Sequence, residues 1–166
     1  MNHPSDMTPF SMPHIEEQDF EKLARALDPF GIARSLINVQ KAWMDHPVDL
    51  LSAMTRFSGD LVALQAHILK RAWGMPDRDI APPHSDDQRF AAPEWSNNPF
   101  WDSIKQGYLM MMRDSVDMVY EAPDLNDKER RRAAFWAKAL LNAFAPTNFF
   151  WTNPVAMQKF VESRGQ

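Results

Sequence analysis

A long uncharged run near the end of the chain places the strongest constraint on its fold. No charged residue occurs between positions 139 and 158. A membrane-spanning helix needs about 20 mostly apolar residues whose backbone groups are hydrogen-bonded within the segment. Five helix-breaking or turn-forming residues interrupt this run, namely Asn142, Pro146, Asn148, Asn153 and Pro154. We therefore predict no membrane span here, but two helices joined by a bend.

The residues of the bend indicate where each helix ends and begins. Pro146 cannot continue a helix, and Asn153 followed by Pro154 supplies an N-cap and a first helical residue. Three aromatic residues, which we call the aromatic elbow, lie between these signals: Phe149, Phe150 and Trp151. They cannot all be buried against one short helix, so we expect another surface to cover them.

The front half of the chain has apolar residues at helical spacing. We predict one helix over residues 18–27 and a second to about Asp45, with Asp28 as its cap and Pro29 at its first position. A third helix ends before Gly74 and Pro76. Its apolar residues recur every three or four positions and form a seam that could pair with another helix: Leu50, Met54, Phe57, Leu61, Leu64 and Ile68.

Capping signals define the helices of the rear half. Asn98 and Pro99 open a helix that runs to about residue 122. Asn126 and Glu129 fit a variant of the capping box and open another helix to about residue 145. A last short helix covers about residues 154–163. No alternating strand pattern occurs, so the predicted fold is all-α, with about five or six helices.

Changes in composition predict four segments along the chain. Residues 1–16 form a mobile N-terminus without periodicity, and residues 17–74 form a front helical segment. Residues 75–93 contain four prolines and no apolar stripe, so we interpret them as a linker. Residues 94–166 form a rear helical block.

Charge and residue usage exclude several functional classes. The net charge of −4 argues against a general nucleic-acid-binding protein, which needs clustered lysine and arginine in excess. The five histidines never lie three or four apart on a helix, so we predict no metal site and expect them at the surface or in loops. The first twenty residues contain four acidic residues and no apolar stretch, which predicts no signal peptide and a cytoplasmic location.

Aromatic residues are the strongest indication of binding. Six tryptophans and eleven phenylalanines exceed what a small helical domain easily buries, and excess apolar surface marks interfaces or hydrophobic ligands. A core made of the same residues is the alternative. We single out seven aromatic residues as a candidate interface: Trp95, Phe100, Trp101, Tyr108, Phe149, Phe150 and Trp151.

Several motifs in the rear half resemble one protein family. The motifs are Arg89-Phe90, P-E-W-S-N-N-P-F-W at 93–101, K-Q-G-Y-L at 105–109 and A-P-T-N-F-F-W-T-N-P at 145–154. In this order and spacing they resemble the N-terminal region of polyhydroxyalkanoate synthases, with class I, the poly(3-hydroxybutyrate) type, the most similar. The resemblance covers about residues 86–166, whereas residues 1–85 share mainly helical character.

The resemblance implies a role without catalysis for this chain. Such synthases are acyltransferases that polymerise (R)-3-hydroxyacyl-CoA with a Cys nucleophile, a His and an Asp. This chain has no cysteine, and no two of its glycines lie closer than 15 residues, so G-x-C-x-G, G-x-S-x-G and phosphate-binding glycine loops are all excluded. We expect the catalytic domain to lie beyond residue 166 or to be absent. No catalytic, cofactor-binding or metal-binding residue is predicted.

The expected role is therefore support of a synthase. As the resemblance implies, the chain would aid folding, dimerisation and granule association. Its partners would be the catalytic domain, in the same or a separate chain, another copy of itself, and granule proteins or the polymer surface. A standalone phasin-like or regulatory granule-binding subunit is the alternative, and a truncated gene remnant is a third possibility. A reading frame that continues into a G-x-C-x-G elbow would distinguish them.

Overall fold

The computed structural model describes residues 22, 25–163 and 165, and within them every regular element is a helix. The all-α prediction is confirmed. The longer helices are α2 (Ile32–Met44), α3 (Pro47–Ala72), α5 (Pro99–Glu121) and α6 (Asp127–Ala143). The shorter elements are η1 (Gln88–Phe90), α4 (Glu94–Asn97), η2 (Pro146–Asn148), η3 (Phe150–Thr152) and α7 (Pro154–Glu162).

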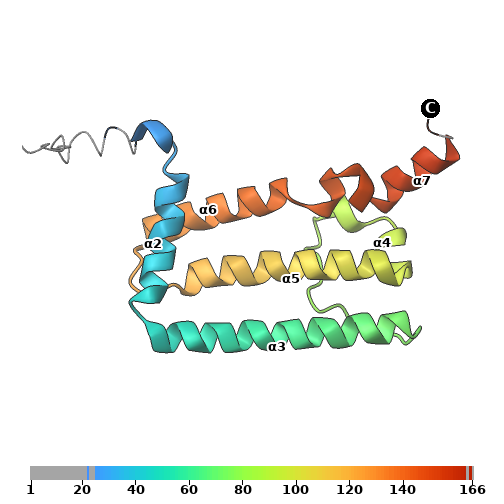
Figure 1. The fold of residues 1–166 in the computed structure, drawn as a ribbon, viewed down its shortest axis with the longest axis horizontal. Helices are drawn as coiled ribbons and strands as arrows, with labels where there is room; N and C mark the ends of the chain where they lie inside the picture. The colour runs from blue at the N-terminus through green and yellow to red at the C-terminus, as the bar shows by residue number, and fades with distance from the viewer. Residues whose placement is uncertain (1–21, 23–24, 164, 166) are drawn as a thin grey trace, which may run out of the picture.

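Three long helices lie side by side in one layer. Helix α5 occupies the middle and packs against α3 on one side and α6 on the other (Figure 1). Helix α2 crosses one end of the layer and packs against α6 and α3. Helices α4 and α7 lie at the opposite end (Figure 1). One end of the layer is therefore closed by α2, and the other by short elements.

Local capping explains where the rear helices begin. The side chain of Asn98 accepts hydrogen bonds from the N–H groups of Phe100 (2.9 Å) and Trp101 (3.4 Å) at the start of α5. Asn126 accepts one from the N–H of Glu129 (3.0 Å) at the start of α6. Asn153 caps α7 in the same way. These three predicted helix starts are confirmed, because each cap satisfies backbone donors that have no partner within the helix.

The predicted start of the second helix is wrong by three residues. Helix α2 begins at Ile32, after Gly31 with a φ of 68°. This left-handed conformation interrupts the helical path, and glycine adopts it at little cost. The carboxylate of Asp28 still accepts hydrogen bonds from the N–H groups of Ile32 (2.6 Å) and Arg34 (3.0 Å). Asp28 was therefore correctly chosen as a capping residue, but it acts from a turn that precedes the helix.

Two further predictions fall partly or wholly outside the residues that the structure describes. The mobile N-terminus at 1–16 lies outside the described residues. So does most of the helix predicted at 18–27, of which the described residues 22 and 25–27 are helical.

The core consists of two clusters, one toward each end of the layer. The first combines α2, α3, α5 and α6: Val39, Trp43, Ala53, Val119, Ala122, Ala133, Ala134 and Ala137. The second combines the segment before α5 with α5 itself: Ala81, Phe90, Trp95, Leu109 and Met110. Phe57 and Leu64 of α3 pack against the second cluster. Helices from both sides of the predicted 75–93 linker thus share core contacts, while the division into folding units stays a prediction.

The segment at 75–93 packs on α5. Ala81 and Phe90 are buried, and the N–H of Ala81 donates a hydrogen bond to the side-chain oxygen of Gln106 (2.9 Å). Arg113 donates a hydrogen bond to the carbonyl oxygen of Ile80 (3.1 Å). The prolines prevent a long helix, so only the short η1 forms here, but Ala81 and Phe90 still pack in the core.

The uncharged run at 139–158 is divided among α6, η2, η3 and α7. Throughout the described ranges, no helix is both long and apolar enough to cross a membrane. The bend predicted from Pro146, Asn153 and Pro154 is therefore confirmed.

Candidate functional site

The structure separates the seven candidate interface residues by exposure. Trp95 is buried, with 1% of its surface exposed. Trp101, Tyr108 and Phe149 are partly buried. Phe100 (64%), Phe150 (44%) and Trp151 (70%) are exposed. Thus only three of the seven present most or much of an aromatic ring to a partner.

Trp95 organises an internal aromatic cluster. Its ring makes edge contacts with Phe90 (5.0 Å between centroids) and Trp101 (6.0 Å). Phe90 also packs against Tyr108 (5.8 Å). Edge-to-face contacts of this kind add to the stabilisation from burial. Trp95 belongs to the core of this chain and is not available to a partner unless the module opens.

The aromatic elbow is held in a fixed bend. The hydroxyl group of Thr152 donates a hydrogen bond to the carbonyl oxygen of Pro146 (2.7 Å), and Asn153 donates one to that of Thr147 (3.0 Å). The ring of Phe149 stacks on that of Trp151 (6.1 Å). Because the backbone is tied back on itself, the exposed rings of the elbow are presented in a defined direction.

An apolar groove lies between α7 and the start of α5. Its volume is about 740 Å³, and its apolar lining comes from Pro93, Trp101, Pro154, Met157 and Val161. On one side Trp101 contacts the exposed Phe100 (4.9 Å), and on the other Phe160 contacts Phe150 (5.2 Å). We call this region the aromatic surface, defined by Phe100, Trp101, Phe150, Trp151, Met157, Phe160 and Val161.

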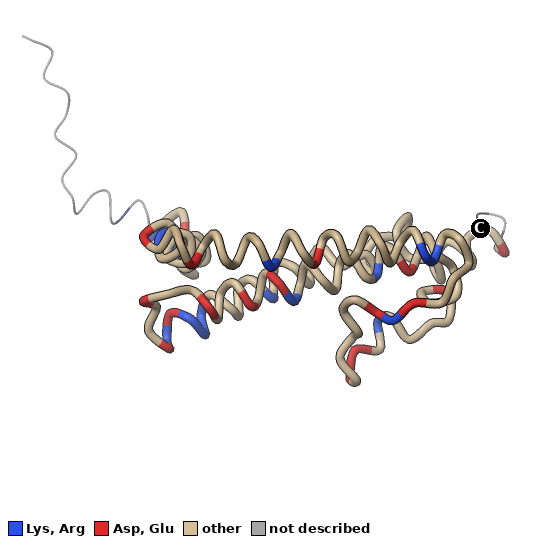
Figure 2. Tube along the Cα trace, turned by 90° about the horizontal axis from the view of Figure 1, so that it is seen from below, with Lys and Arg blue, Asp and Glu red and all other residues tan. Residues whose placement is uncertain are grey.

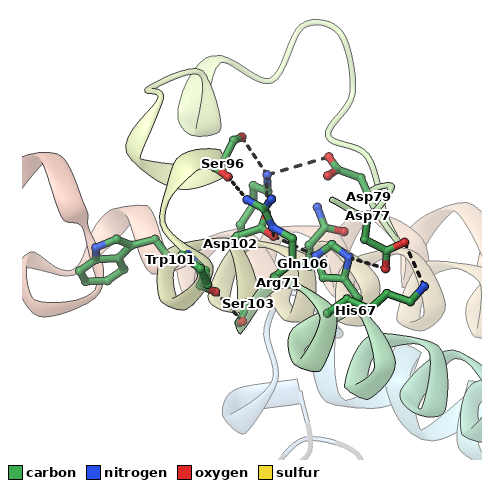
Figure 3. Close-up of polar contacts among 12 residues, drawn as sticks. His67, Arg71, Asp77, Asp79, Ser96, Trp101, Asp102, Ser103 and Gln106 are labelled. Carbon is green, nitrogen blue, oxygen red and sulfur yellow. Dashed lines mark hydrogen bonds and ion pairs between the residues drawn. The ribbon is translucent and has the colours of Figure 1, made fainter. Parts of the chain in front are cut away.

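A buried polar network lies beneath this end of the layer, at the junction of α3, α4 and α5 (Figure 3). At its centre His67, with 1% of its surface exposed, lies between two carboxylates. Its Nδ1 is 3.2 Å from Asp77 and its Nε2 is 2.9 Å from Asp102. Carboxylates only accept, so both contacts are hydrogen bonds only when both ring nitrogens carry protons.

Asp102 is the acceptor that joins the network. It accepts hydrogen bonds from Arg71 (3.1 Å) and His67, and its other oxygen lies 3.0 Å from Lys105. Burial raises the pKa of Asp102, but the hydrogen bonds from Lys105 and His67 outweigh this effect, and the pKa lies below its usual value. Lys105 also donates a hydrogen bond to the hydroxyl group of Ser96 (3.1 Å).

The network ties α4 and the segment that follows α3 to α3 itself, next to the aromatic surface. Arg71 of α3 donates a hydrogen bond to the carbonyl oxygen of Ser96 in α4, and Asp77 ties the following segment to His67. Trp101 points away from the network (Figure 3). The charged groups are thus paired with one another, which is typical of a structural role. In the part of the chain that the structure describes, no three His, Asp or Glu side chains are placed to hold a metal ion.

Sequence reasoning missed this network. His67 was expected at the surface or in a loop, and this is wrong because paired carboxylates compensate its burial. The i, i+3 pair of Asp102 and Lys105 on the same face of α5 was the available signal. It could not show that residues from α3 complete the network.

Comparison with known proteins identifies the rear half of the chain. Residues 86–166 match the family described as "Poly-beta-hydroxybutyrate polymerase (PhaC) N-terminus". These residues are a polyhydroxyalkanoate synthase N-terminal region. No solved structure matches the chain.

Curated relatives extend the similarity toward the N-terminus. The chain is 35% identical over 134 residues to the poly(3-hydroxyalkanoate) polymerase of Methylorubrum extorquens, which is 81% of this chain and 22% of that relative. It is 34% identical over 134 residues to the poly(3-hydroxyalkanoate) polymerase subunit PhaC of Rhizobium meliloti (strain 1021), with the same two shares. Similarity therefore reaches residues before 86, beyond the resemblance recognised in the sequence. This chain spans about a fifth of the length of these relatives.

The synthase motifs meet at the end of the layer that carries the aromatic surface. Arg89 donates hydrogen bonds to Tyr108 (3.3 Å) and Asn142 (3.0 Å), which joins the first motif to α5 and α6. The motif at 93–101 contains Trp95 and Ser96, and the motif at 105–109 begins with the network residue Lys105. The last motif, at 145–154, contains the aromatic elbow. The motifs thus lie together beside the exposed rings of the aromatic surface.

Proposed function

We propose that this chain is the noncatalytic N-terminal part of a polyhydroxyalkanoate synthase, and that its aromatic surface docks on the catalytic domain. The whole enzyme would be a class I acyltransferase that polymerises (R)-3-hydroxyacyl-CoA in the cytoplasm, at polymer granules. This part would support folding, dimerisation and granule association. The exposure of Phe100, Phe150 and Trp151, where the synthase motifs meet, is the observation that carries the proposal.

The chemistry of the chain supports a noncatalytic role. It contains no cysteine to attack a thioester, and no serine framed by glycines to replace it. The carboxylate of Asp102 is buried and paired with Arg71, His67 and Lys105, so it is not presented to a substrate at the surface. The activity must therefore come from another domain.

The geometry of the aromatic surface supports docking. Burying one exposed aromatic side chain contributes about 1.5–3 kcal/mol. Hydrogen bonds from Thr152 and Asn153 already fix the elbow, so little conformational entropy is lost when a partner covers it. A groove beside protruding rings also offers a pocket for side chains of the partner.

Substitution of Trp151 tests the docking proposal. We expect Trp151→Ala to weaken binding of the chain to the catalytic region of the Methylorubrum extorquens relative by about 1.5–3 kcal/mol. The reason is that the variant has no indole ring for the catalytic region to bury. Isothermal titration calorimetry with the two purified parts measures this effect. Trp73→Ala is the matched control, since Trp73 is at least as exposed (79%) as Trp151 (70%) but lies outside the aromatic surface, at the end of α3.

Circular dichroism of the same proteins shows whether a loss of binding comes from unfolding of the variant. Both variants should retain the helical signal of the parent chain, because both rings are exposed. Equal affinities for Trp151→Ala and Trp73→Ala would contradict docking through the aromatic surface. Binding to polymer particles that is lost with Trp151→Ala, without any binding to the catalytic region, would favour a granule-binding subunit instead.

A further inference from the structure

The groove between α7 and the start of α5 carries charge of one sign. Among the described residues that line it, the charged ones are Glu94 of α4 and Glu162 of α7. The other lining residues are apolar or have neutral polar side chains. Helices α4 and α7 contact each other. The groove therefore offers apolar contacts together with one carboxylate from each of two neighbouring helices.

Neither carboxylate has a cationic partner in the part of the chain that the structure describes. Glu94 makes no ion pair there, and Glu162 accepts a hydrogen bond from the neutral side chain of Gln158 (2.8 Å). Two basic residues, Arg71 and Lys105, contact Ser96 in α4, but both are already paired with a carboxylate in the buried network. The two glutamates are thus left to face the groove without a counter-charge.

The basic cluster of the chain lies far from this groove. It stands at the start of α6 and consists of Lys128, Arg130, Arg131 and Arg132. The start of α6 is at the end of the layer that α2 crosses, whereas α4 and α7 are at the opposite end (Figures 1 and 2). The basic cluster therefore does not neutralise the groove.

The position of Glu162 is unfavourable for a carboxylate in the chain alone. It is the last residue of α7, where the helix macrodipole presents partial negative charge and favours cations. Lys159 lies in the same turn, but no ion pair joins it to Glu162 among the described residues. A cation supplied by a partner would compensate both the carboxylate and the end of the helix.

We propose that the segment that fills this groove is apolar and carries a basic side chain, an arginine or a lysine, which binds Glu94 and Glu162. This inference rests on the proposed docking of the aromatic surface on the catalytic domain, and it names the chemistry of the docked segment. The ring of Trp101 lines the groove and can contact the same cation with its face. An acidic segment would bring like charges together. A neutral polymer surface would remove water from both carboxylates without pairing them, which is costly.

Removal of the two charges tests the chemistry of the partner. Isothermal titration calorimetry with the catalytic region of the Methylorubrum extorquens relative compares the parent chain with the double variant Glu94→Gln, Glu162→Gln. We expect the dissociation constant of this variant to be about tenfold higher, because the basic side chain loses both counter-charges. The double variant Asp86→Asn, Asp124→Asn is the matched control. It removes two charges from exposed side chains (89% and 81%) outside the groove, so it should bind like the parent chain.

Further substitutions separate the charge of Glu94 from its packing. Glu94→Asp keeps the charge and should retain most of the affinity, whereas Glu94→Lys brings like charges together and should raise the dissociation constant about a hundredfold. Added salt should weaken binding of the parent chain more than binding of the glutamine double variant, which lacks the charges that salt screens. Circular dichroism should show the helical signal of the parent chain in every variant, because Glu94 is half-buried and Glu162 is exposed.

The outcomes distinguish this inference from docking itself. Binding that weakens in Trp151→Ala but is equal for the parent chain and the glutamine double variant would leave docking intact and overturn the basic segment. Tighter binding of the glutamine double variant would show that a purely apolar or acidic segment fills the groove, and would also overturn it. A parent chain that does not bind the catalytic region would overturn both docking and this inference.

Discussion

Replacing Trp95 with alanine is expected to lower the free energy of unfolding of the chain by about 3–5 kcal/mol. The ring is 1% exposed and contacts Phe90 and Trp101, so its removal leaves a cavity beneath the aromatic surface. Domains of this size have a total stability of about 5–15 kcal/mol, so the loss is large. Urea unfolding followed by circular dichroism at 222 nm, a wavelength that reports helix, measures it.

Trp151→Ala in the same isolated chain is the control for this substitution. Because Trp151 is 70% exposed, its replacement should change the free energy of unfolding by no more than about 0.5 kcal/mol. Equal destabilisation by the two substitutions would show that the elbow belongs to the core of this chain, and would remove the basis for docking.

Replacing Asp102 with alanine should cost about 3–5 kcal/mol of unfolding free energy at neutral pH. The substitution leaves Lys105 buried without its nearest counter-charge and removes the acceptor of His67 and Arg71. Removing one partner of a buried ion pair is strongly destabilising because the other charge stays uncompensated. Urea unfolding again measures the effect. Asp79→Ala is the control, since Asp79 is more exposed and 3.9 Å from Lys105, and it should cost at most about 1 kcal/mol.

The dependence on pH distinguishes the charge of Asp102 from its packing. The pKa of Asp102 is lowered in the folded chain, so its contribution is present above the unfolded pKa of about 3.9 and is lost as pH falls through the lower folded value. The stability difference between the parent chain and Asp102→Ala should therefore shrink below about pH 4. A difference that stays constant with pH would contradict the electrostatic role.

Local signals explain which parts of the fold could be predicted from the sequence. The starts of α5, α6 and α7 were predictable because Asn98, Asn126 and Asn153 bond to backbone N–H groups within three residues. The start of α2 was missed because Gly31 interrupts the path after a correctly chosen cap. Local chemistry therefore fixes helix ends unless the backbone departs from its expected conformation.

Contacts distant in sequence explain which parts of the site could not be predicted. The network joins His67 to Asp102, 35 residues away, and no spacing rule within one helix reveals such a pair. Burial of Trp95 likewise depends on Phe90, Leu109 and Met110, which share its core cluster but lie outside its own motif. Aromatic content indicated an interface, but only the packing separates Trp95 from the exposed Phe100 and Trp151.

The two faces of α3 illustrate the same limit. Apolar spacing predicted the seam that includes Phe57 and Leu64, and these residues pack toward α5 in the second core cluster. The structure shows that the opposite side of α3, which includes Val48, Leu51, Val62 and Leu69, is exposed. Periodicity identifies a face that must be buried, but the neighbours decide which face remains for a partner.

One measurement tests the central claim most directly, namely that this chain assists catalysis without performing it. Release of CoA from (R)-3-hydroxybutyryl-CoA would be followed for the chain alone, for the relative's catalytic region alone, and for the two together. We expect no release by the chain, and a rate for the mixture that exceeds that of the catalytic region and falls when Trp151→Ala replaces the parent chain. Turnover by the chain alone, or a rate for the catalytic region that is indifferent to the chain, would contradict the claim.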